Sequence, residues 1–256
     1  MYIRFSELRG FAVVGREVGA SDAPASLGAL EDLLVDVRDW RVVHLALAAG
    51  GPLATRHVLL GSDRPVAFDL ARRELATEWT PYDVDVAPDA ASVRTAADDD
   101  PDGGAADGGA GTGAGGLLFG PGDPTAPAGG GQAVLGGDPD AVPVPRSEEE
   151  RHLHGARELL GYAVDGTDGE VGTVTDLLVD RESPAIAWLV VDTGSWLQHR
   201  EVVLDPAWTR GAAAGSRRAA VALSRGQVRD APPPADLDGL DRAYGTALAA
   251  FYRLVS

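Results

Sequence analysis

A serine, a histidine and an aspartate lie close together in the second half of the chain, at Ser195, His199 and Asp192. These residue types make up the hydrolytic triad, in which histidine takes the serine proton and aspartate orients the histidine. A catalytic serine also needs a sharp turn that exposes it and backbone donors for the oxyanion. The sequence around Ser195 predicts neither, so we interpret Asp192 and Thr193 as residues that fix the turn after a strand.

Two histidines, His152 and His154, follow a run of three glutamates, Glu148 to Glu150. Imidazoles two residues apart lie on one side of an extended segment, and the carboxylates are the nearest additional ligands. A metal site needs three or four such ligands. The ordinary interpretation is an exposed end of a linker, and we predict no metal site.

Two further motifs lie in a segment of low complexity. Residues 111–116 fit the G-x-G-x-x-G pattern of a dinucleotide-binding loop, but such a loop needs a strand before it and a helix after it. Residues 98–103 are rich in aspartate, but Gly109 stands where a calcium-binding EF-hand loop needs its closing glutamate. We therefore predict no cofactor and no catalytic residue.

A candidate binding pair, a tryptophan followed by a leucine, comes after the predicted central strand of the second half. Tryptophan and arginine dominate interface hot spots, so Trp196, Leu197 and Arg200 are predicted partner-binding residues. Tyr244 and Phe251, on the apolar face of a C-terminal helix, are two more. The alternatives are that Trp196 caps the open end of its own barrel and that the helix packs on that barrel.

The elements that hold these residues come from an internal repeat. Over most of the repeat, matching residues of the two copies are separated by a constant 144 positions (27 to 171). The separation is 151 upstream (7 to 158), and downstream the matched residues are 155 apart (66 to 221), which predicts an insertion in the second copy. A self-match of this length predicts two copies of one domain. The aligned segments are 27–60 with 171–204, 7–13 with 158–164, and 66–68 with 221–223.

Short β-rich runs bounded by turn residues predict an all-β fold of two small antiparallel barrels in tandem. In the second copy, Asp168-Gly169 predicts a tight hairpin. Residues 186–191 are continuously apolar and predict a central buried strand. Ser224 and Gln227 have the spacing of a capping box, which predicts a helical turn. A short amphipathic helix, expected from about Asp236, closes the chain.

The charge of the chain is concentrated in its middle. Residues 81–150 hold 14 acidic and 2 basic residues, so this segment carries −12 of the net charge of −17. It also has few large apolar side chains, which predicts a flexible, disordered acidic linker. The predicted domains are a divergent barrel at 1–80, the linker at 81–150, a second barrel at 151–231, and a proline stop with the helix at 232–256.

Composition excludes several classes of function. The chain has no cysteine, which excludes disulfides and thiolate chemistry. Neither copy carries the basic stripe that nucleic-acid binding requires. No apolar run approaches the roughly 18 residues of a membrane span, and the N-terminus lacks the apolar region of a signal peptide. We expect a soluble, cytoplasmic protein that binds no nucleic acid and does not insert into a membrane.

The second copy resembles the PRC-barrel family, named for the H subunit of the photosynthetic reaction centre and shared with a ribosome-maturation factor. The resemblance rests on five segments: Glu158-Leu-Leu-Gly-Tyr162, and residues 172–180, 188–197, 201–204 and 223–232. The first copy is more divergent, since it lacks the Asp-Gly hairpin and has Pro52 where the second copy has Trp196.

The resemblance implies a small β-barrel that serves in assembly and binding, not in catalysis. The segment that follows the second copy in this chain is similar to the C-terminal tail of stand-alone bacterial members. The expected function is therefore a protein-binding adaptor or scaffold, with a protein partner and a possible homo-oligomer. The alternative is a small-ligand sensor with a pocket of roughly 300 Å³ at a barrel mouth or inter-barrel cleft. An enzyme or metal-dependent site at the barrel–barrel interface is less well supported.

Overall fold

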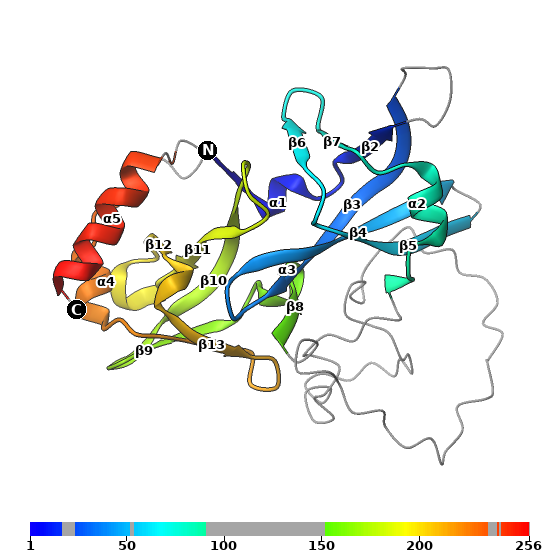
Figure 1. Cartoon of the computed structure of the whole chain (residues 1–256). Coiled ribbons are helices and arrows are strands. Elements are labelled where there is room, and N and C mark those ends of the chain that lie inside the picture. Colours follow the sequence, from blue (N-terminus) through cyan, green and yellow to red (C-terminus); the bar gives the residue numbers. More distant parts are fainter. Residues whose placement is uncertain (17–23, 52–53, 91–151, 235–239, 241, 256) are drawn as a thin grey trace, which may run out of the picture.

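The structure, a computed structural model, describes residues 1–16, 24–51, 54–90, 152–234, 240 and 242–255 (Figure 1). It is mostly β, with one sheet in each half of the chain and few helices, as the sequence predicted. Most of the predicted acidic linker, from residue 91 to residue 151, lies outside the described residues.

The first sheet has seven strands in the order β5-β4-β3-β2-β7-β6, with β8 paired to β3 off this path. Its strands are β2 (Ala12–Arg16), β3 (Pro24–Asp36), β4 (Arg41–Gly51), β5 (Ala54–Gly61), β6 (Val66–Asp69), β7 (Glu74–Thr77) and β8 (Leu153–Gly155). Buried and less buried residues alternate in β2, as expected of a strand with one face on a core.

The second sheet repeats this order as β12-β11-β10-β9-β14-β13, with β1 paired to β10. Two sequence predictions are confirmed here: a tight hairpin joins β9 to β10, and β11 is a buried strand between β10 and β12. The strands are β1 (Tyr2–Arg4), β9 (Ala163–Gly166), β10 (Gly169–Asp180), β11 (Ile186–Asp192), β12 (Glu201–Leu204), β13 (Thr209–Ala213) and β14 (Arg218–Val221).

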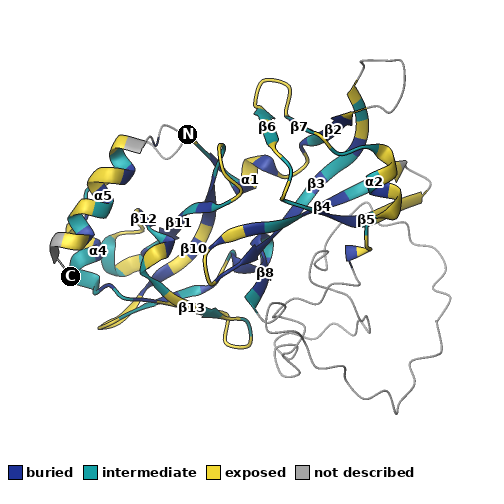
Figure 2. Cartoon of the chain, in the orientation of Figure 1, coloured by how far each residue is buried: buried dark blue, intermediate teal, exposed yellow. Residues whose placement is uncertain are grey.

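The two halves exchange their first strands. β1, from the first half, pairs antiparallel with β10, and β8, from the second half, pairs antiparallel with β3. The short helices α1 (Phe5–Leu8) and α3 (Ala156–Leu159) follow these strands and bury apolar side chains. One continuous cluster contains most of the buried apolar residues of both halves, and Figure 2 shows buried segments where the sheets meet. Leu34, Ala46, Leu59 and Ala90 form a second, smaller cluster in the first half. The predicted boundary between two self-contained barrels is therefore crossed in both directions.

Both sheets contain a parallel pair of strands, which differs from the predicted antiparallel arrangement. β2 runs parallel to β7, and β9 runs parallel to β14. Because a parallel pair needs a crossover rather than a tight turn, it joins strands that are distant in sequence. Hairpin signals along the chain could not reveal it.

The offset of 144 continues to the end of both copies, so the predicted downstream insertion is wrong. β7 (74–77) corresponds to β14 (218–221), and both pair with the equivalent parallel neighbour. The apparent match of 66–68 with 221–223 arose because four-residue strands carry too little pattern to fix a register.

A short helix follows the last strand of each copy. In the second copy Ser224 and Gln227 form the predicted capping box at the start of α4 (Arg225–Asp230). In the first copy Thr80 and Asp83 form the equivalent box at α2 (Pro81–Val86), which lies within the predicted linker. Val84 and Ala90 are buried, so the packed part of the first half extends ten positions beyond residue 80.

The C-terminal helix α5 (Arg242–Val255) packs on the second sheet, which confirms a closing helix. Leu248 and Tyr252 are fully buried. Gly245 lies so close to the Trp188 ring that an added Cβ would stand 2.8 Å from a ring carbon. This glycine therefore allows a close approach of the helix to the sheet. None of the helices in the described part of the chain has the length and apolarity that a membrane crossing requires.

Candidate functional site

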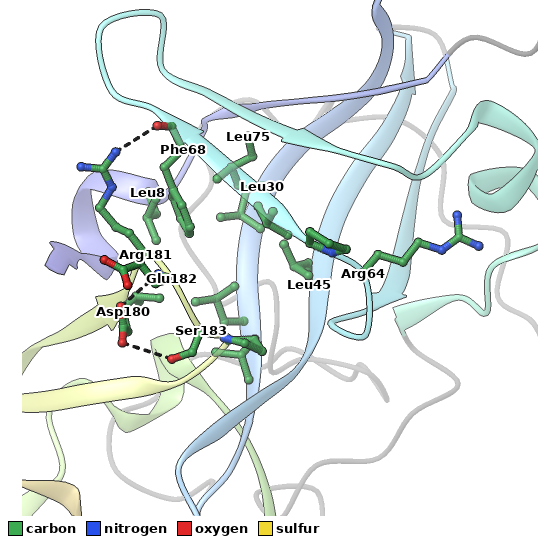
Figure 3. Close-up of a pocket in the computed structure, with 16 residues that line it drawn as sticks. Leu8, Leu30, Leu45, Arg64, Phe68, Leu75, Asp180, Arg181, Glu182 and Ser183 are labelled. Atoms are coloured by element: carbon green, nitrogen blue, oxygen red, sulfur yellow. Dashed lines mark hydrogen bonds between the residues drawn. The ribbon is translucent and has the colours of Figure 1, made fainter. Parts of the chain in front are cut away.

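An apolar pocket of about 140 Å³ opens where the two halves meet (Figure 3). Its floor consists of side chains from α1 and from strands β3, β4, β6 and β7 of the first sheet. One wall is the turn between β10 and β11 of the second half, residues 181–184. The apolar lining residues are Leu8, Leu30, Leu33, Val42, Leu45, Pro65, Val66, Phe68, Leu75, Val179 and Pro184.

The wall from the second half is held in place by hydrogen bonds. Val42 donates its backbone N–H to the Pro184 carbonyl at 2.9 Å, and Arg181 donates from Nη2 to the Phe68 carbonyl at 3.1 Å. Within the turn, Ser183 donates to the Asp180 carboxylate at 3.1 Å. The pocket is therefore a fixed feature of the contact between the halves, not a gap in a loose loop.

Charged groups lie at the rim of the pocket rather than inside it. Arg64 points away from the cavity in Figure 3, and its guanidinium lies over the Trp79 ring and bonds to Asp83. Hydrogen bonds from Thr80 and then from Arg64 hold the pKa of Asp83 below its usual value. Asp180 accepts bonds from its own turn. The interior is left to apolar side chains.

The polar groups of the lining bond to their own surroundings. The lining contains no histidine, and its one hydroxyl, Ser183, donates to the Asp180 carboxylate. In the described part of the chain, no three His, Asp or Glu side chains are placed to hold a metal ion. The arrangement can bind an apolar group by excluding water.

The predicted partner-binding residues gather elsewhere, around α4 and α5 of the second half. Trp196 is half-buried in a 3-10 helix (Gly194–Leu197) and donates from Nε1 to the Val171 carbonyl at 2.7 Å. The Arg225 guanidinium lies 5.1 Å from the centre of its ring. Leu197 beside it is also half-buried. The Trp196 side chain is thus neither fully enclosed in its own barrel nor fully exposed to a partner.

Arg200 and Tyr244 attach the C-terminal segment to the second sheet. Arg200 donates to the Arg229 and Ala231 carbonyls, at 3.3 and 2.9 Å. Tyr244 donates its hydroxyl to the Pro232 carbonyl at 2.9 Å, and burial raises its pKa to about 12. Each of these two side chains thus has a partner within the chain.

Phe251 is half-buried, and its ring centre lies 5.4 Å from that of Tyr252. The structure therefore brings the predicted partner-binding residues to one side of the second half and separates them from the pocket, to which none contributes.

Ser195, His199 and Asp192 do not form a hydrolytic triad. His199 is exposed, and its Nδ1 lies 3.3 Å from Asp192 Oδ2. Among the described residues no hydrogen bond joins Ser195 to His199. Asp192 instead accepts the Gly194 N–H, the main cause of its lowered pKa, and so fixes the turn after β11 as predicted. The glycine motif at 111–116, the aspartates at 98–103 and Glu148–Glu150 lie outside the described residues.

A buried polar cluster that the sequence did not predict lies where β8 joins the first sheet. His154 Nδ1 is 3.1 Å from Glu158 Oε1, and the Tyr162 hydroxyl donates to the same oxygen. All three side chains are buried, and burial first, then Glu158, raises the pKa of Tyr162 above its usual range. The predicted exposed linker end is therefore wrong at His154: because β8 is a strand of the sheet, this side chain faces the protein interior.

Each half also buries an aspartate at a β-bulge, against the exchanged helix of the other half. Asp176 accepts from the backbone N–H and the hydroxyl of Ser6. Asp32 accepts the Leu33 and Arg157 N–H groups at 2.8 and 3.1 Å, but its Oδ2 has no hydrogen-bond partner. Burial raises the pKa of Asp32 to about 7. The offset pairs these aspartates in the sequence, but nothing in the sequence indicates their burial.

Comparison with known proteins agrees with the resemblance found in the sequence. Residues 152–221 match the family model of the PRC-barrel domain, from β8 to the end of β14. No curated protein matches the chain. The second half of this protein, from β8 to β14, is therefore similar in sequence to the PRC-barrel domain.

Proposed function

We propose that this protein is a non-catalytic protein-binding adaptor, and that the pocket between its halves receives an apolar side chain of the partner. The observation that carries the proposal is the pocket itself, which is apolar and lined by both halves. The PRC-barrel domain of the second half supports it, since such modules often act in protein interactions.

The size of the pocket favours a side chain over a larger free ligand. Ligand pockets usually hold about 300 Å³ or more, and this one holds about 140 Å³. An apolar cavity of about 150 Å³ accepts a molecule the size of benzene. A single ring or branched aliphatic group therefore fits, and the rest of the partner would lie on the surrounding surface.

The predicted surface of Trp196, Leu197, Arg200, Tyr244 and Phe251 is a second proposed contact for the same partner. All five side chains are half-buried, so each keeps part of its surface for another protein. This contact lies on the second half only, whereas the pocket needs both halves.

Site-specific photo-crosslinking in the source cells tests the proposal. A photoreactive phenylalanine analogue would replace Ser183 at the pocket mouth, Leu197 on the second surface, or Tyr82 as the control. Tyr82 is 69% exposed on α2 and lies outside both surfaces, so it reports random encounters. We expect the Ser183 variant to give a discrete protein adduct that the Tyr82 variant does not give.

The other outcomes separate the alternatives. The absence of a protein adduct at Ser183, or the same adducts at Ser183 and Tyr82, would contradict the adaptor function at the pocket. An adduct of small mass at Ser183 would instead favour a ligand sensor. An adduct at Leu197 with the same protein would support the second contact.

A further inference from the structure

The two halves use equivalent turns to cover each other, but with different residues at the tip. In the first half this turn follows β3 and carries Trp40; in the second half it follows β10 and carries Pro184 at the position 144 residues later. The backbone contacts are reciprocal: Ile186 donates to the Trp40 carbonyl at 2.8 Å, and Val42 donates to the Pro184 carbonyl at 2.9 Å. The halves are therefore related by a pseudo-twofold arrangement at this contact.

Trp40 fills the second half. Its side chain is only 4% exposed, and its Nε1 donates to Thr209 Oγ1 in the second half at 2.7 Å. Thr209 corresponds to Pro65, which lines the pocket of the first half. The backbone of Trp40 has a φ of 58°, a conformation that residues other than glycine rarely adopt. The second half thus contains an indole in the place equivalent to the pocket.

Pro184 cannot fill the first half in the same way. Its ring is smaller than an indole and its φ is fixed near −65°, so it cannot adopt the conformation of Trp40. Phe68, which stands where the second half has Ala212, takes some of the equivalent space. About 140 Å³ stays open beside it.

We infer that the pocket of the first half is a receptor for an aromatic side chain. A partner's side chain would occupy it as Trp40 occupies the equivalent space in the second half. The occupant to which we commit is a tryptophan or phenylalanine residue of the protein partner. This inference rests on the proposed adaptor function and specifies the group that the partner inserts.

The polar surroundings favour phenylalanine or a tryptophan whose N–H reaches the rim. Pro65 lacks the hydroxyl that Thr209 offers to Trp40, so the deep hydrogen bond of the second half has no equivalent. Acceptors are present at the rim instead, on Asp180 and Glu182. The charges of Asp180 and Glu182 are balanced by those of Arg64 and Arg181, so the rim has no excess negative charge that would select a cationic side chain.

Binding of N-acetyl-phenylalaninamide and N-acetyl-tryptophanamide to the purified full chain tests the inference. A single side chain of this size should bind with a dissociation constant of about 1 mM, seen by ligand-observed nuclear magnetic resonance. N-acetyl-glycinamide, which lacks the ring, should not bind. Binding of neither aromatic probe at about ten times that concentration would overturn the inference.

Variants that fill the pocket from within supply the matched control. Pro184→Trp places an indole at the position equivalent to Trp40, and Val66→Trp fills the pocket from β6. Either should weaken probe binding by at least about tenfold if the protein keeps its near-ultraviolet circular dichroism. Pro184→Ala leaves the pocket open and should bind the probe as the parent does. Unchanged binding in both folded tryptophan variants would place the probe elsewhere and overturn the inference.

The two proposals fail in different ways. A protein adduct at Ser183 without binding of the aromatic probes would leave the adaptor function standing and remove the aromatic occupant. A partner that crosslinks at Ser183 should in turn lose its affinity for the purified chain when one of its own aromatic residues is changed to alanine. If no single aromatic residue of that partner matters, the inference is wrong.

Discussion

Asp32 and Asp176 occupy equivalent positions, but their hydrogen-bond partners differ. Ser6 gives Asp176 a hydroxyl, whereas Arg157 stands in the equivalent place beside Asp32 and donates its backbone N–H to it. One carboxylate oxygen of Asp32 therefore has no partner. An unpaired buried charge is costly, so burial favours the protonated form of Asp32.

This difference predicts a pH dependence of stability. The pKa of Asp32 is raised to about 7 in the folded protein, from 3.8. Between these values the folded state binds a proton that the unfolded state releases, so the contribution of Asp32 is present below pH 4 and is lost as the pH rises to about 7. The slope is about −1.4 kcal/mol per pH unit at most. Urea unfolding at a series of pH values measures it.

Asp32→Asn should remove this slope while leaving the contributions of the other aspartates in place. Arg157→Ser offers Asp32 the hydroxyl that Ser6 gives Asp176 but removes a positive charge that lowers the pKa of Asp32. The direct hydrogen bond should outweigh the lost charge, so the slope should decrease. If the free energy of unfolding of Asp32→Asn follows that of the parent in parallel from pH 4 to pH 7, Asp32 titrates as an ordinary carboxylate.

At the scale of elements, α5 shows how packing overrides helix propensity. A glycine in the interior of a helix costs about 1 kcal/mol relative to alanine, and Gly245 has that position in the sequence. The Trp188 ring lies against it, and Trp188 in turn contacts the ring of Tyr2 on the exchanged strand β1. The missing side chain thus lets the last helix contact the sheet that the first strand completes.

Gly245→Ala should therefore destabilise the protein by about 1–2 kcal/mol, because the added methyl group overpacks against Trp188 by more than the gain in propensity. In a Trp188→Leu background the ring is gone, and the same change should stabilise by about 1 kcal/mol. Thermal and urea unfolding of the four proteins of this double-mutant cycle measure both values. Stabilisation of the parent protein by Gly245→Ala would show that the Trp188 ring can move enough to accommodate the added methyl group.

At the scale of the whole molecule, neither sheet is complete without a strand from the other half. β1 and β8 cross between the halves, and one apolar cluster runs through both. The pocket also needs both halves, since the turn at 181–184 closes a cavity floored by the first sheet. The proposed binding at the pocket would therefore depend on the contact between the halves.

Cutting the chain in its middle should leave the two halves together. A specific protease site would be introduced near residue 115, in the segment that the sequence predicts to be a flexible linker, and the folded full-length protein would be treated with that protease. We expect the two fragments to elute as one species in gel filtration and to unfold in one transition, because the strand exchange persists without the covalent link. Fragments that elute separately at micromolar concentration would mean that the exchanged strands contribute little.

The repeat, the strand content and several local structures could all be predicted from the amino-acid sequence alone. The offset of 144, the Asp168-Gly169 hairpin, the buried strand at 186–191 and the Ser224–Gln227 capping box are all present in the structure. Each of these signals depends on neighbouring residues or on direct comparison of the copies. The same logic, applied to Thr80 and Asp83, would have revealed α2.

The pairing of strands across the two halves and the lining of the pocket could not be predicted in this way. Apolar periodicity shows that a strand has a buried face, but it does not specify the sheet that buries it. The offset places Trp40 and Pro184 at equivalent positions, yet nothing local shows that each side chain covers the opposite half. The pocket, and the burial of Asp32 and His154, follow from that long-range pairing, because they arise where segments distant in sequence pack together.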